Sequence, residues 1–202
     1  MHIDIMSSAA TPTTRDRILN AACRLLEGYP DDKTRMADIA RAAEVSRQAV
    51  YLHFENRADL LTEALRYRDE QTGLQDRLAP YRAAETGEAK IEAFVAFWAD
   101  HVPRVQGMAR ALLALRDSDP AAEAAWAERM AATREGCESC MRRLADEGRL
   151  AAPWDVTTAT DLFWAMLSIQ NWMLLTGPCG WSEQDYTERL TRQALRTFVA
   201  PT

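Results

Sequence analysis

The sequence predicts an all-α protein. Alanine is the commonest residue, whereas valine and isoleucine together supply only 13 of the 202 residues, so helix formers far outnumber strand formers. Apolar residues recur at spacings of three and four along most of the chain, which is the period of a helix. No stretch has the alternating pattern of a strand, and the chain has no internal repeat. We therefore expect about nine helices.

Composition and charge narrow the class of protein. With 48% hydrophobic and 27% charged residues, the chain is neither collagen-like nor broadly disordered. Its net charge of −6 excludes a nucleic-acid-binding protein whose whole surface is basic, but it does not exclude a local basic patch. Residues 1–67 carry 9 basic and 10 acidic side chains, against 15 and 20 in the remainder. The N-terminal third is thus nearly neutral and the rest is acidic.

The sequence also predicts a cytoplasmic location. Four cysteines in 202 residues do not make a disulfide scaffold, and residues 1–17 lack the basic start and apolar core of a signal peptide. The longest apolar run, 162–175, is interrupted by polar residues and is shorter than the roughly 20 residues of a membrane span. We expect no membrane contact.

The N-terminal third reads as a loose arm followed by short helices. Residues 1–13 form the arm, and the first helix ends at Gly28–Asp31. A second helix is expected from about Arg35, with Thr34 as its N-cap. A turn follows at Glu44 and Val45, and Ser46 is then the expected N-cap of a helix over 47–53. Asn56 is the expected N-cap of a longer helix that runs toward Leu78 and ends at Pro80.

The remaining chain predicts five more helices. Asp119 followed by Pro120 marks the start of one of them. Gly148, and Gly177 followed by Pro178, mark helix ends. Ser182 and Asp185 have the spacing of a capping box. The expected ranges are about 85–101, 104–117, 120–147, 156–176 and 183–199.

Residues 34–57 have the pattern of a helix-turn-helix. Two short helices flank a three-residue connection, with the small Ala40 where they would cross. In this motif the second helix enters the DNA major groove, so its outer face needs hydrogen-bond donors. Arginine and glutamine can read guanine and adenine edges, whereas tyrosine and histidine can reach phosphates. The outer face here carries Arg47, Gln48, Tyr51 and His53.

With these residues in place, positions 15–66 resemble the DNA-binding domain of the TetR family of transcriptional repressors. The resemblance covers about a quarter of the chain, and beyond residue 70 only helix number and chain length agree with that family. The residues that carry it are Ile18, Ala21, Ala22 and Leu25, then Asp38, Ile39, Ala40, Ala43, Val45 and Ser46, then Val50, Tyr51, His53, Phe54, Asn56, Arg57, Leu60 and Leu61.

The chain departs from the family pattern at the turn and in the second helix. Glu44 stands where the family usually has glycine, and a left-handed backbone there would cost roughly 1 kcal/mol. Gln48 and Ala49 replace a common Gly-Thr pair, so the operator sequence cannot be inferred.

The resemblance implies two domains with different functions. Residues 14–67 would form the DNA-binding domain, and residues 68–202 a helical ligand-binding and dimerisation domain. Arg47, Gln48 and Tyr51 would meet bases or the adjacent backbone. Phosphates would be held by Thr34, Arg35, His53 and Arg57. The alternative is a helical bundle with solvated arginines.

The C-terminal part is rich in large apolar side chains. Much of this set must be core, but tryptophans on separate helices are hard to pack completely and often line pockets. We expect a ligand pocket formed by Phe94, Trp98, Met108, Trp126, Met130, Trp164 and Trp172.

The last two predicted helices suggest a dimer. Residues 155–176 are apolar nearly all round, so they need cover from their own core and from a partner. Two helices from each subunit would form an isologous four-helix interface. The expected interface residues are Trp172, Tyr186, Leu190, Ala194, Leu195 and Phe198.

The cysteine pair and one histidine each allow two interpretations. Cys137 and Cys140 lie on one apolar helix stripe, which favours core packing over a thiol sensor or metal site. His101 is either a helix-end histidine or a polar contact in a ligand pocket. We expect no metal and no cofactor.

The main hypothesis is a dimeric repressor that binds a palindromic double-stranded DNA operator and is released by a small apolar or amphipathic ligand. One alternative is a DNA-binding regulator gated by a protein or by thiols. The other is an all-α enzyme, which is disfavoured because the chain has three histidines and neither a nucleophile elbow nor a glycine-rich phosphate loop.

Overall fold

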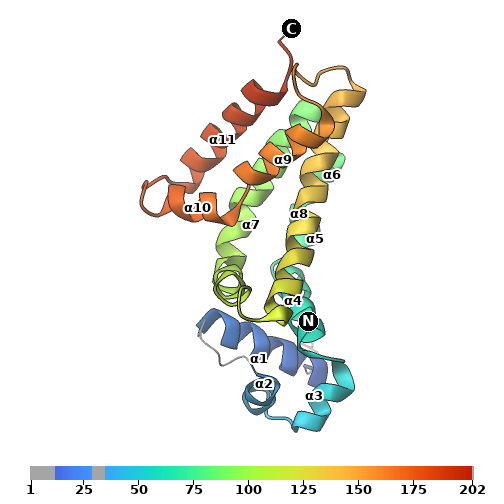
Figure 1. Cartoon of the computed structure of the whole chain (residues 1–202), viewed down its shortest axis with the longest axis vertical. Helices are drawn as coiled ribbons and strands as arrows, with labels where there is room; N and C mark the ends of the chain where they lie inside the picture. Colours follow the sequence, from blue (N-terminus) through green and yellow to red (C-terminus); the bar gives the residue numbers. More distant parts are fainter. Residues whose placement is uncertain (1–11, 29–34, 202) are drawn as a thin grey trace, which may run out of the picture.

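The computed structural model describes residues 12–28 and 35–201, and within these ranges the chain is all-α, as predicted. It forms eleven helices there, and its only β-type pairing in these ranges is an isolated bridge between Leu150 and Val199. The molecule is elongated, with α1–α3 at one end and α7 and α8 along its length (Figure 1). None of the described helices is long and apolar enough to cross a membrane.

The N-terminal unit comprises α1 (Thr14–Gly28), α2 (Met36–Ala42), α3 (Arg47–His53) and α4 (Arg57–Gln71). The caps of α3 and α4 are as predicted: the Ser46 hydroxyl and the Asn56 side chain each accept a hydrogen bond from a backbone N–H three residues on, at 3.0 Å. The N-cap of α2 is Arg35, whose side chain makes no capping bond. Thr34, the expected N-cap, lies outside the described residues, as do residues 1–11 of the expected arm.

The helix that begins after Asn56 is shorter than expected. It ends at Gln71, because Gly73 adopts a left-handed backbone with φ of 68°. Two short helices follow, α5 (Leu74–Arg77) and α6 (Ala79–Ala83). Pro80 lies in the first turn of α6 and so does not end a helix.

One long helix, α7 (Gly87–Leu115), replaces two expected ones. Pro103 lies inside it, and the helix continues because residues on both sides of the proline, such as Trp98 and Met108, are buried in the core. A proline inside a helix removes a backbone hydrogen bond and bends the axis. Figure 1 shows α7 changing direction toward its C-terminal end.

The C-terminal half contains α8 (Pro120–Asp146), α9 (Val156–Met166), α10 (Ile169–Thr176) and α11 (Glu183–Phe198). The single helix expected over 156–176 is broken. Ser168 caps a new helix by accepting a bond from the Asn171 N–H at 3.2 Å, and Asn171 donates to the Ala165 carbonyl at 2.7 Å. The polar residues that interrupt the apolar run thus produce the break. The capping box of Ser182 and Asp185 is confirmed.

Helices α4 and α8 lie side by side and are joined by ion pairs along their length. The partners are 62, 62 and 60 residues apart, so the two helices run in the same direction. This arrangement connects the N-terminal unit to the C-terminal bundle. The pairs are Arg57–Asp119, Arg66–Glu128 and Asp69–Arg129.

Candidate DNA interface and ligand cavity

Helix α3 is held by its inner face and exposes its outer face. Val50 is fully buried and Phe54 almost so, which fixes the helix against α1 and α2. The polar residues of the outer face are exposed, as the sequence predicted. The Arg47 guanidinium lies over the Tyr51 ring, 5.6 Å from its centroid, and donates to the Tyr51 hydroxyl at 3.4 Å. This helical pair places a cation and an aromatic hydroxyl together on the exposed face.

A hollow of about 500 Å³ brings four of the predicted DNA-binding residues together. Three guanidiniums surround it, and it opens between the starts of α2, α3 and α4 and the connection to α8. A concave surface with several arginines suits phosphate oxygens. Gln48 and His53 are exposed on α3 but do not line it. Its lining is Arg35, Met36, Ala37, Arg47, Tyr51, Arg57, Leu115, Ser118 and Asp119.

Arg57 also makes a contact that the sequence did not indicate. Its guanidinium forms an ion pair with Asp119, and the two side chains are only 24% and 19% exposed. Asp119 also caps α8 by accepting a bond from the Ala121 N–H at 3.0 Å. The start of α4 is therefore fastened to the start of α8. No local pattern could reveal a contact between residues 62 positions apart.

The turn between α2 and α3 is left-handed at Glu44, with φ of 55°. Glu44 is the one non-glycine residue with positive φ in the described part of the chain. Arg17, which was not singled out from the sequence, donates to the Ala43 and Glu44 carbonyls at 2.6 and 3.1 Å. These bonds from α1 hold the strained turn in place.

Leu52 is a further exposed residue that the sequence analysis passed over. Its side chain is 80% exposed on α3, next to the half-exposed Tyr51. The signal was available, because burial of Val50 and Phe54 turns position 52 outward on a helix. An exposed leucine on this helix offers an apolar contact surface to a partner.

A cavity of about 210 Å³ lies between α5, α6, α7 and α8. Four aromatic side chains, Tyr81, Phe94, Phe97 and Trp98, form part of its wall. Gly136 provides space in this wall, because a β-carbon there would overlap the Phe94 ring. The other lining residues are Leu74, Leu78, Arg82, His101, Arg129, Ala132 and Thr133.

Only two of the residues expected to form a ligand pocket, Phe94 and Trp98, line this cavity. The other five pack in or against the core outside it. The contribution of α5 and α6 was not predicted, because residues 74–78 were expected at the end of a longer helix and no helix was expected over 79–83. Met108, Trp126 and Trp172 are buried, and Met130 and Trp164 are partly buried.

His101 is a buried residue of the cavity wall, not a helix-end residue, because α7 continues past it. Its Nδ1 lies 2.8 Å from Arg77 Nη2, and its Nε2 lies 2.5 Å from Arg129 Nη2. Burial, reinforced by these two cations, lowers the pKa of His101 to about 3. The imidazole is therefore neutral at physiological pH.

Asp69 connects this wall to α4. Its carboxylate is 7% exposed and accepts two hydrogen bonds from Arg129, the longer at 2.9 Å. Burial raises the pKa of Asp69, and the Arg129 guanidinium opposes that shift. This bidentate pair joins the last turn of α4 to the cavity wall on α8.

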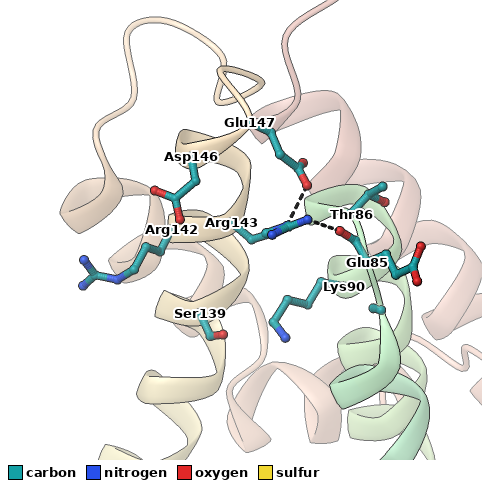
Figure 2. A pocket seen from close by; sticks show the side chains of 9 residues that line it. Glu85, Thr86, Lys90, Ser139, Arg142, Arg143, Asp146 and Glu147 are labelled. Atoms are coloured by element: carbon teal, nitrogen blue, oxygen red, sulfur yellow. Dashed lines mark hydrogen bonds and ion pairs between the residues drawn. The ribbon is translucent and has the colours of Figure 1, made fainter.

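A larger hollow of about 620 Å³ lies near the ends of α7 and α8 that are distant from α3 (Figure 2). Its charges are balanced, because three cationic and three acidic side chains line it: Lys90, Arg142, Arg143, Glu85, Asp146 and Glu147. Arg143 already donates to Glu147 at 2.7 Å and to the Glu85 carbonyl. This polar surface has neither the apolar wall nor the surplus charge of the smaller cavity.

Most residues of the expected dimer face on α11 are buried within the single chain, and their part in a dimer stays a prediction. Tyr186, Leu190, Ala194 and Phe198 are at most 8% exposed within the single chain, and they pack toward its own core. Trp172 is likewise buried. Leu195 is partly buried against the same core. The large apolar side chains exposed in this region are Leu162 on α9 and Leu174 on α10, at 37% and 53%.

Cys137 and Cys140 are fully buried in the core. Burial raises the pKa of Cys137 well above its ordinary value and that of Cys140 to about 12. Such thiols are poor nucleophiles and poor metal ligands. Among the described residues, no group of three or more metal-ligating side chains comes together.

Comparison with known proteins adds independent information. Residues 18–64 match the model of the family described as bacterial regulatory proteins, tetR family. The HTH-type transcriptional regulator AcrR of Shigella flexneri is 42% identical over 50 residues, which cover 25% of this chain and 23% of that protein.

Solved structures match nearly the whole chain. NalD of Pseudomonas aeruginosa, the secondary repressor of the MexAB-OprM multidrug efflux pump, is 25% identical with a TM-score of 0.67, over 94% of this chain and 98% of NalD. A transcriptional regulator of Saccharomonospora viridis, solved in complex with choline, is 18% identical with a TM-score of 0.70, over 93% and 98% of the two chains. The latter likeness concerns the fold alone.

Proposed function

Because this chain belongs to the TetR family of bacterial regulatory proteins through its helix-turn-helix, we propose that it is a ligand-released repressor that binds its operator as a homodimer. The family assignment makes it a transcriptional regulator with a DNA-binding helix-turn-helix. Repression, dimeric binding and release by a ligand are the proposed parts. The division into a DNA-binding unit over 14–67 and a ligand-binding and dimerisation unit over 68–202 is also part of the proposal.

The observation that carries the proposal is the basic hollow beside α3. Arg35, Arg47 and Arg57 converge there, while Gln48 is exposed on the adjacent face of α3. Phosphate contacts position a protein on DNA, and base contacts specify the sequence. In this chain the hollow would hold the backbone while α3 enters the major groove. Thr34 keeps its proposed phosphate role, although it lies outside the described residues.

A ligand-responsive function is supported by the cavity in the C-terminal half. It is concave and mainly apolar, with a few polar groups, as small-molecule sites generally are. Helix α4 lies between this cavity and the basic hollow, since Asp69 and Arg57 stand near its two ends. The Saccharomonospora viridis neighbour was solved with a small molecule, choline. Gating by thiols has less support, because Cys137 and Cys140 are buried.

The two recognition helices of a dimer must stand one helical turn of DNA apart, roughly 34–36 Å, to engage adjacent half-sites. A ligand that favours one orientation of α4 would change that spacing and release the DNA. By linkage, operator DNA would weaken ligand binding by the same factor.

Operator binding tests the proposal. The operator is first selected from random duplexes with the full chain, and affinities are then measured by gel shift. Arg47→Ala and Gln48→Ala should each cost roughly 1–3 kcal/mol and relax base preference at one position. Arg192→Ala, on the exposed side of α11, is the matched control and should change nothing. Unaltered affinity and specificity in both α3 variants would remove α3 from the major groove.

A further inference from the structure

The charged groups that line the ligand cavity are cationic. Arg82 and Arg129 both face it, and no carboxylate is among the described residues of its wall. Arg129 is paired with Asp69 behind the wall, whereas Arg82 donates to the Gln75 backbone and side-chain oxygens at 3.4 and 2.6 Å. Positive charge next to aromatic rings favours an anionic ligand with an apolar body.

The size of the cavity limits that ligand to a small molecule. A volume of about 210 Å³ exceeds the roughly 150 Å³ of an engineered apolar cavity that binds benzene. One aromatic ring with a short polar group therefore fits. The wall of four aromatic side chains would contact the faces and edges of such a ring.

The N–H of the neutral His101 ring faces a hydrogen-bond donor where it needs an acceptor. A neutral imidazole has one donor and one acceptor nitrogen, but Arg77 and Arg129 present N–H donors to both of its nitrogens. One of these contacts therefore sets a donor against a donor. Asp69 Oδ1 is 3.6 Å from His101 Nε2, too far for a good hydrogen bond. An added anionic acceptor beside Arg129 would resolve this conflict.

Arg129 also holds the last turn of α4 against α8. Asp69 lies on α4, and its only charged hydrogen-bond donor among the described contacts is Arg129. A carboxylate entering the cavity would thus compete with Asp69 for one guanidinium. Such competition would loosen the last turn of α4 from α8.

We propose that the cavity takes a small aromatic monocarboxylate, and that its carboxylate displaces Asp69 from Arg129. The inference deepens the proposed ligand-released function and rests on it for the effect on DNA. Binding requires no covalent step. The carboxylate gains charge-assisted bonds from Arg129 and Arg82, and the aromatic body occupies the ring-lined part of the cavity.

Binding to the full chain without DNA is measured by calorimetry with three probes of similar shape. Phenylacetate should bind roughly tenfold or more tightly than the neutral phenylacetamide, because only the acid makes charge-assisted bonds. The cation phenethylammonium should bind least. Equal affinities, a preference for the amide or the amine, or no binding by any of the three would overturn the proposal.

Variants then locate the anion. Arg129→Met should bring phenylacetate and phenylacetamide to similar affinities, and Arg82→Met should reduce the preference by a smaller factor. Arg134→Met is the matched control, since Arg134 lies on the same helix and pairs with Asp161 outside the cavity. An unchanged acid preference in Arg129→Met would rule out the assigned contact. Melting curves accompany each variant, and the comparison of probes on the natural chain does not depend on them.

Asp69→Asn tests the competition itself. With the competing charge removed, phenylacetate should bind roughly tenfold more tightly, yet should no longer change operator affinity. Weaker or unchanged acid binding would contradict the competition. If phenylacetate binds with the expected preference but leaves operator affinity unchanged in the natural chain, the ligand-release function fails while the anion site stands.

Discussion

Glu44 holds a backbone conformation that its side chain does not favour. A non-glycine residue with φ of 55° is strained by contact between its β-carbon and the backbone, and Arg17 maintains the turn from α1. The departure from the family's glycine was visible in the sequence, and the structure confirms the left-handed turn. The bracing by Arg17 was not visible, because it joins residues 26 and 27 positions apart.

Glu44→Gly should stabilise the protein by about 1 kcal/mol, since glycine adopts this conformation without the β-carbon penalty. Urea unfolding followed by circular dichroism measures the change. The control is Glu44→Ala, which removes the exposed carboxylate but keeps the β-carbon and should leave stability nearly unchanged. Equal stabilisation by both substitutions would assign the effect to charge instead of backbone strain.

His101 makes stability depend on pH. Its pKa is about 3 in the folded protein and near 6.5 when unfolded, so between these values the unfolded chain binds more protons. The free energy of unfolding therefore falls as pH decreases below about 6.5, by up to about 1.4 kcal/mol per pH unit. Asp69, with a raised pKa, contributes with the opposite sign as its carboxyl titrates.

His101→Gln isolates this contribution. The natural chain should lose stability between about pH 7 and pH 5 more steeply than the variant, because glutamine does not titrate. Denaturant titrations at several pH values give the two slopes. Parallel slopes would mean that His101 is protonated in the folded protein or stays solvated there.

Helix boundaries set by neighbouring residues were predictable, whereas those decided by tertiary contacts were not. The caps at Ser46, Asn56 and Asp119 act within three residues, so the sequence contains the whole signal. A break was expected between 101 and 104, where Pro103 lies, yet the burial of α7 on both sides outweighs the roughly 3 kcal/mol cost of an internal proline. The cavity wall unites α5 to α8, which no local pattern indicates.

The contact between the starts of α4 and α8 should limit DNA affinity. Asp119→Ser keeps a good N-cap for α8 but removes the charge that pairs with Arg57. Operator affinity should rise by up to about fivefold for all sequences alike, because a partly exposed ion pair is worth up to ~1 kcal/mol. Glu128→Ser, which removes the Arg66 pair away from the hollow, should have no such effect. A lower affinity of Asp119→Ser would indicate that the ion pair aligns α4 for binding.

At the scale of the molecule, residues 155–176 leave part of their apolar surface exposed in the single chain, and its cover by a partner stays a prediction. The broken helix exposes Leu162 and Leu174, while the predicted face of α11 is used by the chain's own core. An amphipathic stripe on one helix cannot say whether it packs within a chain or between chains. The sequence therefore indicated that an apolar surface must be buried, but not which face of which helix meets a partner subunit.

The exposed leucines of α9 and α10 should be part of the dimer interface. The double variant Leu162→Glu, Leu174→Glu should be monomeric by light scattering, because burying two carboxylates in an apolar interface is unfavourable. Gln71→Glu on α4 is the exposed control and should leave the mass unchanged. A dimer that survives the double substitution would place the interface elsewhere.

The ion pairs between α4 and α8 have a consequence for how operator binding responds to ionic strength. Arg66 and Glu128 are 59% and 49% exposed, so added salt screens their attraction, whereas the more buried Asp69 is protected. Salt would therefore weaken the contact between α4 and α8 unevenly along its length, in addition to reducing the free energy gained when counterions are released from the DNA. Because the Asp69–Arg129 pair keeps its strength, the decline of operator affinity with salt should follow the number of bound phosphates, with no added contribution from the Arg66–Glu128 pair.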